Sequence, residues 1–254
     1  MPEDARTAAP AVATQARRAR VSGQIIRQLE DAIVLGRLAV GDRLPSERDL
    51  QEQMEVSRNT LREGLRVLEQ KGLVEIRKGR RGGIFVRELT SGPMAESLGL
   101  FVKSQRVTME DISEFRQDLE GLLARRAAQR AGPGHLEELR RLLRRAEALA
   151  EAGPGEWEAF METDKEVHLA LARLGGNPLH HCFLETVHDN LHHWQITAYL
   201  PRDEEMILTT LAELRELVGA VALGDGDRAE ALAREHVQRA TAIMRLRRPG
   251  GTIH

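Results

Sequence analysis

In the first third of the chain, the spacing of apolar residues changes from a helical to a strand-like period. Leu61, Leu65 and Leu68 recur at intervals that place them on one face of a helix, which we expect to run from Arg58 to Gln70. Gly72 follows and favours the end of this helix, because glycine readily adopts the left-handed conformation found there. The pattern predicts a helix with one face against a small core.

A shorter helix is expected just before it, from Glu47 to Met54. Ser46 is a good N-cap residue, and Asp49 follows three positions later, within reach of the cap. Val56 and Ser57 then form the turn, and Ser57 can cap the second helix. Two short helices joined by a tight turn indicate a helix-turn-helix.

The residues after the second helix predict a two-stranded hairpin. Val74 and Ile76, and then Ile84 and Val86, alternate with polar residues as strands do. The connecting turn is rich in glycine and basic residues, namely Arg77, Lys78, Gly79, Arg80, Arg81, Gly82 and Gly83. A helix-turn-helix followed by a basic hairpin is the layout of a winged helix-turn-helix, which indicates DNA binding.

The second helix carries polar side chains where a recognition helix reaches the major groove. Arg58, Asn59, Thr60 and Arg62 lie in its first turns. An arginine can hold guanine through two hydrogen bonds, and asparagine or threonine can contact other base edges or phosphates. The helix N-terminus at Ser57 favours phosphate. A solvated surface is the alternative for any single arginine, but the basic hairpin beside this helix favours DNA.

These residues carry a resemblance to a known family. The segment from about Val21 to Val86 resembles the DNA-binding domain of GntR-type bacterial regulators, and the matching runs are LPSER at 44–48, VSR at 56–58 and the glycine-rich hairpin at 79–83. By position, the resemblance implies DNA contacts by Arg48, Arg58 and Arg62, with help from Thr60 and the hairpin. The candidate DNA-contacting residues are Arg48, Ser57, Arg58, Asn59, Thr60, Arg62, Arg77, Lys78, Gly79 and Arg80.

Beyond residue 93 the pattern is helical throughout. Breaks rich in glycine and proline separate helices expected near 94–104, 109–131, 135–151, 156–175, 178–199, 203–224 and 227–247. Short connections imply antiparallel neighbours in a bundle. We therefore expect a mainly α protein: a winged helix-turn-helix with a small β-hairpin, followed by an all-α bundle. The expected parts are a disordered tail (1–18), the DNA-binding domain (19–88), a linker (89–93), the bundle (94–247) and a C-terminal tail (248–254).

Composition adds a contrast between the two parts. Residues 1–88 carry 17 Lys and Arg against 13 Asp and Glu, whereas residues 89–254 carry 20 against 26. A basic first part and an acidic second part suit a DNA-binding domain joined to a domain that avoids DNA. The single cysteine, Cys182, excludes an internal disulfide and a cysteine-based zinc site. With no apolar run long enough for a signal peptide or a membrane span, the sequence predicts a cytoplasmic protein.

All nine histidines lie in the second part. Asp164 and His168 are four residues apart, so they share one helix face and can bind one metal ion. A surface pair or a core histidine is the alternative interpretation. His236 on the last helix is a further candidate, and His188 and His192 repeat the i, i+4 spacing. Packing and solvation explain most histidines in such runs.

The bundle resembles the FadR-type C-terminal ligand-binding domain, known as FCD. The matching stretches are Glu114–Arg116 with Leu119–Glu120, Asp164–His168 through Gly176–Pro178, Gly224–Asp225 and Glu235–His236. Many FCD domains bind a divalent metal ion through one Asp and three His. By position, Asp164, His168 and His236 match three of these ligands.

The fourth ligand departs from the family pattern. The family usually has Glu-His-Arg where this chain has Glu213, Leu214 and Arg215, and leucine cannot ligate a metal. The site then has three ligands, recruits His188 or His192, or binds no metal. Three ligands and an open position for water or an effector carboxylate are chemically reasonable, with zinc, nickel or manganese as the candidate ions.

Arg116 is the candidate anchor for a carboxylate effector. By resemblance it faces the effector cavity, and a guanidinium matches a carboxylate through paired hydrogen bonds. The alternative is an ion pair with Glu120, four residues further along the same helix. His192 is the second candidate for an effector contact.

The chain lacks the GxSxG, P-loop, HExxH and helix-opening GxGxxG motifs of common enzymes. The sequence thus gives little support for catalysis.

The resemblance to both families predicts a homodimeric transcription regulator, usually a repressor. We expect it to bind double-stranded DNA at an operator with two half-sites and to respond to a small organic acid. Two alternatives stay open. One is a constitutive DNA-binding regulator with a metal-free structural bundle, and the other is a metal-dependent enzyme that uses Asp164, His168 and His236.

Overall fold

The computed structural model describes residues 23–105, 107–193 and 199–247. The expected tails, 1–18 and 248–254, lie outside these ranges, as do the side chains of residues 192 and 193. The chain divides into two compact units, Met1–Pro93 and Met94–His254. This division falls at the end of the expected linker.

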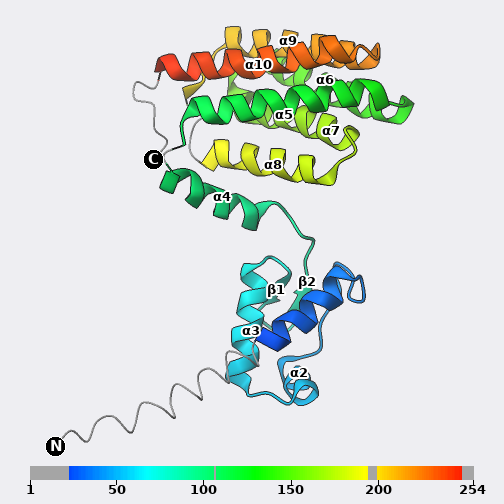
Figure 1. Cartoon of the computed structure of the whole chain (residues 1–254), viewed down its shortest axis with the longest axis vertical. Helices are drawn as coiled ribbons and strands as arrows, with labels where there is room; N and C mark the ends of the chain where they lie inside the picture. The colour runs from blue at the N-terminus through cyan, green and yellow to red at the C-terminus, as the bar shows by residue number, and fades with distance from the viewer. Residues whose placement is uncertain (1–22, 106, 194–198, 248–254) are drawn as a thin grey trace, which may run out of the picture. The chain divides into compact units, whose positions relative to one another are not determined.

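The described part of the first unit contains helices and one hairpin (Figure 1). Residues 23–34 are helical, followed by α2 (Glu47–Met54), α3 (Arg58–Gln70), β1 (Val74–Arg77) and β2 (Gly83–Val86). The expected limits of α2 and α3 are confirmed. The helix at 23–34 was not predicted from the sequence, although Ile25 and Leu29, four residues apart, bury its inner face.

Local hydrogen bonds explain where these helices begin and end. The Oγ atom of Ser46 accepts a hydrogen bond from the backbone N–H of Asp49 at 3.2 Å, and Asp49 reaches back to the N–H of Ser46. Glu55 adopts the left-handed conformation, with φ of 53°, and ends α2. Gly72, with φ of +73°, follows α3 in the same conformation. The expected capping signals at Ser46 and Gly72 are therefore confirmed.

The hairpin closes the small core of this unit. Val74 pairs with Val86, and Ile76 pairs with Ile84, in an antiparallel register. Val74, Ile84 and Val86 are buried together with the leucine stripe of α3, which consists of Leu61, Leu65 and Leu68. Apolar burial on one face of each element leaves the first turns of α3 and the hairpin tip at the surface.

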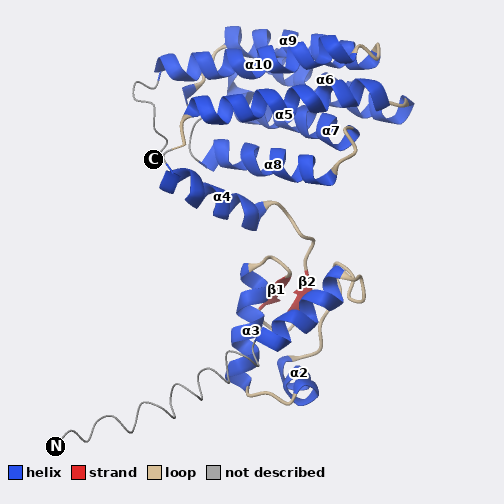
Figure 2. Cartoon of the chain, viewed as in Figure 1, coloured by secondary structure: helices blue, strands red, loops and turns tan. Residues whose placement is uncertain are grey.

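The second unit is all helical in its described residues (Figure 2). Its elements are α4 (Gly92–Gln105, which starts at the end of the first unit), α5 (Met109–Arg130), α6 (Pro133–Ala152), η1 (Pro154–Glu156), α7 (Trp157–Leu174), α8 (Pro178–His193), α9 (Glu204–Ala222) and α10 (Gly226–Arg247). Six expected helices agree with these limits to within two residues. The expected helix 178–199 is described as α8 to His193, and residues 194–198 lie outside the described ranges.

α5 is the central helix of this bundle. It packs along α10 on one side and against α7 and α8 on the other, as Figure 1 shows. The core is aliphatic apart from a few aromatic residues such as Trp157 and the fully buried Phe160. Because α5 lies between α7 and α10, polar side chains from three helices meet inside the bundle. No helix in the described ranges has the length and apolar character to cross a membrane.

Candidate functional site

The first turns of α3 present exposed polar side chains. Ser57 caps the helix by accepting a hydrogen bond from the backbone N–H of Thr60 at 3.2 Å. Arg58, Asn59 and Arg62 are exposed, as a recognition helix requires. The local sequence thus turns these three residues toward solvent while the leucine stripe faces the core.

Thr60 differs from its neighbours. Its side chain belongs to a residue that is only 5% exposed, and its Oγ1 atom lies 2.8 Å from the Oγ atom of Ser57. A buried hydroxyl that is already hydrogen-bonded is less available to a base edge. The Thr60 side chain thus supports the start of α3, and its contact with DNA stays a prediction.

The hairpin tip carries its basic residues at the surface. Arg77, Lys78, Gly79 and Arg80 are all exposed. Gly79 has φ of 100°, a left-handed conformation that favours glycine at this turn. The guanidinium of Arg77 lies 4.5 Å from the ring centroid of Phe85, so a cation–π contact holds it along the hairpin.

Two carboxylates of α2, those of Glu52 and Glu47, form ion pairs with exposed arginines of this unit. Arg48 is exposed, and its Nε atom donates a hydrogen bond to Glu52 at 3.1 Å. The Oε2 atom of Glu47 accepts a hydrogen bond from Nε of Arg62 at 2.9 Å and lies 3.9 Å from Nε of Arg58. Exposed ion pairs add at most about 1 kcal/mol to stability, so their main effect is on side-chain orientation.

Three candidate ligands converge in the second unit. Asp164 and His168 lie one turn apart on α7, and His236 lies on α10. One ligand atom from each residue lies within 4.8 Å of the other two, and all three residues are buried. The structure therefore brings together the Asp and two His residues that the sequence singled out.

The distances fit a shared metal ion better than hydrogen bonds. Oδ1 of Asp164 lies 3.8 Å from Nε2 of His168 and 3.6 Å from Nε2 of His236. These distances exceed those of hydrogen bonds, whereas atoms bound to one zinc ion at about 2.0–2.2 Å lie roughly 3–4 Å apart. Within the described part of the chain, Oδ1 of Asp164 and Nε2 of His168 are buried without a hydrogen-bond partner. A divalent cation would satisfy both atoms.

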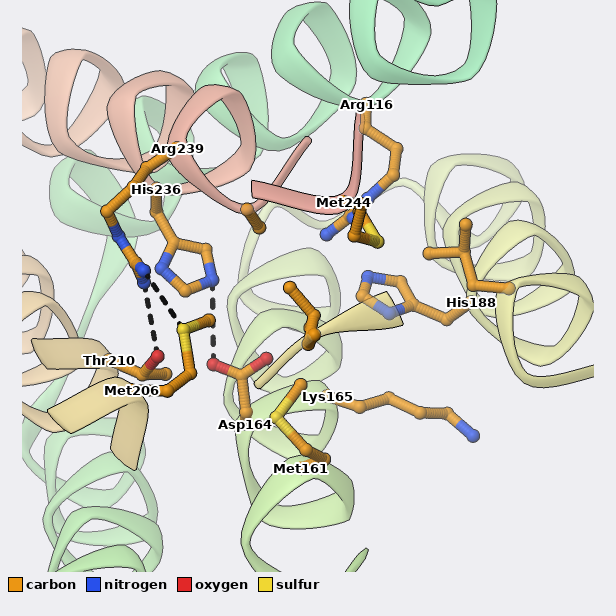
Figure 3. Close-up of a pocket in the computed structure, with 13 residues that line it drawn as sticks. Arg116, Met161, Asp164, Lys165, His188, Met206, Thr210, His236, Arg239 and Met244 are labelled. Carbon is orange, nitrogen blue, oxygen red and sulfur yellow. Dashed lines mark hydrogen bonds and ion pairs between the residues drawn. The ribbon is translucent and has the colours of Figure 1, made fainter. Parts of the chain in front are cut away.

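A carboxylate lies behind each of the two histidines. Nδ1 of His168 is 2.7 Å from Oε2 of Glu120, and Nδ1 of His236 is 2.7 Å from Oε2 of Glu213. A carboxylate at Nδ1 fixes the ring orientation and leaves Nε2 as the metal-binding atom. Both Nε2 atoms lie on the side of Asp164, as Figure 3 shows for His236.

Glu120 is almost completely enclosed, with a side chain that is 1% exposed. Arg116 donates from Nε to its Oε1 atom at 2.6 Å, and Nε2 of His188 lies 3.4 Å from the same oxygen. Burial acts most strongly and raises the pKa of Glu120, but the combined effects of Arg116, His168 and His188 hold this pKa well below its ordinary value. Burial likewise acts to lower the pKa of His168, whereas Glu120 and Asp164 raise it above its ordinary value. The salt-bridge alternative for Arg116 is therefore confirmed.

His188 lies next to the candidate ligand His168. Its ring centroid is 5.9 Å from that of His168. Burial, followed by the charge of Arg116, lowers the pKa of His188 to about 4, so the ring is neutral at pH 7. Among the described residues, the ligand atoms that cluster belong to the Asp and two His already named and not to His188. A role for His188 as an additional ligand stays a prediction, and the side chain of His192 lies outside the described part.

α9 carries Leu214 where the family pattern has its histidine, and the carboxylate of Glu213 one position before it. Leu214 is 1% exposed and belongs to the apolar core. Its neighbour Glu213 accepts hydrogen bonds from Nε and Nη2 of Arg239, the latter at 2.6 Å. Burial acts to raise the pKa of Glu213, but His236 and Arg239 lower it. Glu213 is therefore an anion whose carboxylate contacts Nδ1 of His236.

A cavity of about 40 Å³ is lined by two of the three candidate ligands, Asp164 and His236 (Figure 3). Its wall includes Asp164, His236 and the guanidinium groups of Arg116 and Arg239. Arg239 also donates to Oγ1 of Thr210 at 3.1 Å. This volume holds roughly three water-sized groups. The combination of two cationic side chains and a potential metal ion suits a small anion.

Sequence reasoning missed three of these residues or gave them another role. Glu120 was considered only as a partner of Arg116, while Glu213 and Arg239 were not singled out. Glu120 and His168 are 48 residues apart in the sequence, and Glu213 and His236 are 23 residues apart. No rule based on local spacing therefore identifies these pairs. Arg239 follows His236 by three positions, on a neighbouring face of α10, and this spacing was the available signal.

Comparisons with known proteins match both units. The family model described as "Bacterial regulatory proteins, gntR family" matches residues 21–86. The model described as "FCD domain" matches residues 111–239, which include all three candidate ligands.

Similar proteins extend over most of the chain. A Mycobacterium gastri protein named as the HTH-type transcriptional regulator RmpR is 32% identical over 218 residues, which cover 85% of this chain and 77% of that protein. The HTH-type transcriptional repressor NanR of Enterobacter sp. (strain 638) is 28% identical over 233 residues, or 89% and 85% of the two chains. The solved structure of Streptococcus agalactiae GntR superposes with a TM-score of 0.68 at 25% identity, covering 87% of this chain and 99% of that one.

Proposed function

The chain belongs to the GntR family of bacterial regulatory proteins and carries an FCD domain, and from this premise we propose that it senses a small carboxylate through a divalent metal ion. The family makes it a transcription regulator and not an enzyme. The observation that carries the proposal is the convergence of Asp164, His168 and His236 beside a cavity lined by Arg116. We also propose that the chain belongs to the FadR subfamily of these regulators.

DNA contacts come from the winged unit in this proposal. The first turns of α3 enter the major groove, and the hairpin tip lies along the phosphate backbone. Exposure and family membership support contacts by Arg48, Ser57, Arg58, Asn59, Arg62, Arg77, Lys78, Gly79 and Arg80. Arg58 and Arg62 are the side chains best suited to guanine, because a guanidinium pairs with two acceptors on one base edge.

The DNA contacts are tested with an operator selected by the wild-type protein from a pool of random duplexes. Arg58→Ala and Arg62→Ala should each weaken binding to this duplex roughly tenfold or more, because a bidentate base contact is lost. Arg66→Ala, at an exposed arginine further along α3, is the matched control and should bind as the wild type does. Unchanged affinity in the first two variants, with thermal unfolding also unchanged, would contradict this recognition helix.

Asp164, His168 and His236 would hold the metal ion, with Glu120 and Glu213 orienting the two rings. A bound divalent cation supplies positive charge and open coordination positions for an oxygen ligand. Zinc, nickel and manganese agree with a donor set of two imidazoles and one carboxylate. Leu214 removes the fourth ligand of the family pattern, which leaves one more position open to an effector.

A small organic acid fits the remaining features of the cavity. Arg116 lies on its wall with Nε paired to Glu120, so the outer edge of the guanidinium is oriented for a carboxylate. Arg239 and Thr210 offer polar groups on another part of the wall. The volume of about 40 Å³ favours acids of a few heavy atoms.

The effector proposal is tested with formate, acetate, glycolate, lactate, pyruvate and malonate on the metal-loaded protein. One of these acids should raise the melting temperature and change operator affinity, because a ligand that binds the folded state stabilises it. Arg116→Lys keeps the charge but loses the paired donors, and it should weaken this response roughly tenfold. If no acid affects either quantity, the carboxylate assignment fails.

We further propose a homodimer, because an operator with two half-sites requires two winged units. The bundle supplies the contacts between the copies, and the protein acts in the cytoplasm, where bacterial DNA lies. Repression is the proposed sign of regulation, since the NanR relative is named a repressor. The alternative is a constitutive DNA-binding regulator with a metal-free bundle, which Leu214 favours. It predicts an operator affinity that responds to neither metal nor acid.

A further inference from the structure

Glu47 occupies a particular position in the winged unit. It is the first residue of α2, yet its carboxylate contacts the neighbouring α3. Its Oε2 atom accepts a hydrogen bond from Nε of Arg62 at 2.9 Å and lies 3.9 Å from Nε of Arg58. The Glu47 side chain is 30% exposed, whereas those of Arg62 and Arg58 are 50% and 66% exposed. One partly sheltered carboxylate thus meets both exposed arginines of the recognition helix.

The atoms involved matter for reading DNA. An arginine grips O6 and N7 of guanine with two N–H groups. Because Nε of Arg62 donates to Glu47, the terminal Nη1 and Nη2 atoms of Arg62 remain on the outer edge of its guanidinium. Arg58 approaches the same carboxylate more loosely, with Nε at 3.9 Å. A long side chain also loses conformational freedom on binding, and a contact formed in advance reduces that loss.

We propose that Glu47 is a positioning residue that determines operator specificity by holding Arg62 and Arg58 in the orientation that reads guanine. This inference rests on the proposed DNA contacts of the two arginines. The competing role for Glu47 is to stabilise the N-terminus of α2 through the helix dipole. That end already has a capping box formed by Ser46 and Asp49, so α2 does not depend on Glu47 for its start.

Positioning and the alternative roles of Glu47 predict different changes in DNA affinity. A role in the stability of α2 alone would change binding to every duplex by a similar factor. A carboxylate at a DNA-binding surface repels phosphates, so its removal strengthens binding to every sequence when charge is the only effect. Removal of a positioning contact weakens binding to the operator and leaves binding to unrelated DNA equal or tighter. The ratio of the two affinities therefore separates the roles.

The experiment uses the full chain and two duplexes. One is the duplex selected by the wild type from a random pool, and the other is a scrambled duplex of the same length and composition. Glu47→Ala should lower the operator-to-scrambled affinity ratio roughly tenfold, and Glu47→Gln, which keeps a neutral acceptor, should lower it less. Glu63→Ala removes one negative charge from an exposed position on α3 and should keep the ratio of the wild type.

A second background shows whether Glu47 acts through the arginines. In an Arg58→Ala, Arg62→Ala double variant, Glu47→Ala should change the ratio no further. A ratio within twofold of wild type in Glu47→Ala overturns the inference while the proposed contacts of Arg58 and Arg62 stand. An unchanged ratio in the arginine variants themselves overturns both. Thermal unfolding of each variant separates these results from a loss of fold.

Discussion

Glu120 and Glu213 contact the Nδ1 atoms of the two histidines in the candidate metal site. Each lies 2.7 Å from the Nδ1 atom of one histidine, and each is also paired with an arginine of the cavity wall, Arg116 or Arg239. A carboxylate in such a position fixes the Nε2 atom toward the metal. In the proposed function, metal binding and the charge of the cavity are therefore linked through these two carboxylates.

Glu213→Gln should weaken metal binding about 10- to 100-fold, because the amide no longer holds His236 as an anion does. The measurement is a competition titration against a chromophoric chelator. Glu216→Gln is the matched control, since Glu216 lies on α9 but is exposed and pairs with Arg228. Equal affinities in both variants would show that Glu213 does not support the site.

Glu120→Gln should destabilise the metal-free protein by about 3 kcal/mol, because it removes one partner of a buried charge network. Arg116 would keep its charge, while Glu120 would no longer supply the opposite one. Urea unfolding measures the change, with Glu114→Gln as a control at an exposed position of α5. A loss no greater than that of the control would contradict the network.

At the scale of elements, the wing depends on one close backbone turn. The N–H of Gly82 donates to the carbonyl of Gly79 at 2.8 Å, and the side chain of Arg43 donates to the carbonyl of Gly82 at 2.7 Å. A Cβ atom on Gly82 would lie 2.4 Å from the carbonyl oxygen of Arg77. Glycine is therefore required here by space, and the tip that carries the basic residues depends on it.

Gly82→Ala should shift the hairpin tip and reduce DNA affinity several-fold, because phosphate contacts require the placement of the basic residues. Metal binding in the bundle should not change. Gly134→Ala is the control, since an added Cβ there meets nothing within 4 Å. An operator affinity equal to that of the wild type would show that the wing does not contribute to binding.

The elements that the sequence predicted correctly are those with local signals. Ser46 and Ser57 mark helix starts, Gly72 marks an end, and glycine–proline breaks separate the helices of the bundle. The helix at 23–34 was not predicted, although Ile25, Leu29 and Ile33 recur at helical spacing and pack into the core of this unit. The carboxylates behind the histidines were missed because they are partners only after α5, α7, α9 and α10 pack together.

At the scale of the whole molecule, the protein joins a basic winged helix-turn-helix unit to an acidic FCD unit. Residues 1–88 have an excess of Lys and Arg, and residues 89–254 have an excess of Asp and Glu. Because of this charge difference, electrostatic attraction to DNA phosphates is confined to the first unit. A ligand in the second unit can change DNA binding only if it favours one arrangement of the two copies over another.

The homodimer proposal makes a mass prediction. Sedimentation equilibrium should give twice the chain mass of 28.4 kDa at micromolar concentration. An operator with two half-sites should then bind one dimer, and a duplex with a single half-site should bind much more weakly because only one winged unit is engaged. A chain that stays monomeric, both free and on the operator, would contradict this assembly.

In the proposed function, Asp164, His168 and His236 form a metal site although Leu214 replaces a fourth ligand. The decisive measurement is elemental analysis of purified, chelator-free protein, with Asp164→Ala prepared in parallel. We expect about one divalent ion per chain in the wild type and a marked loss in the variant. No bound metal after incubation with zinc, nickel or manganese would contradict the proposed metal site and favour a metal-free structural bundle.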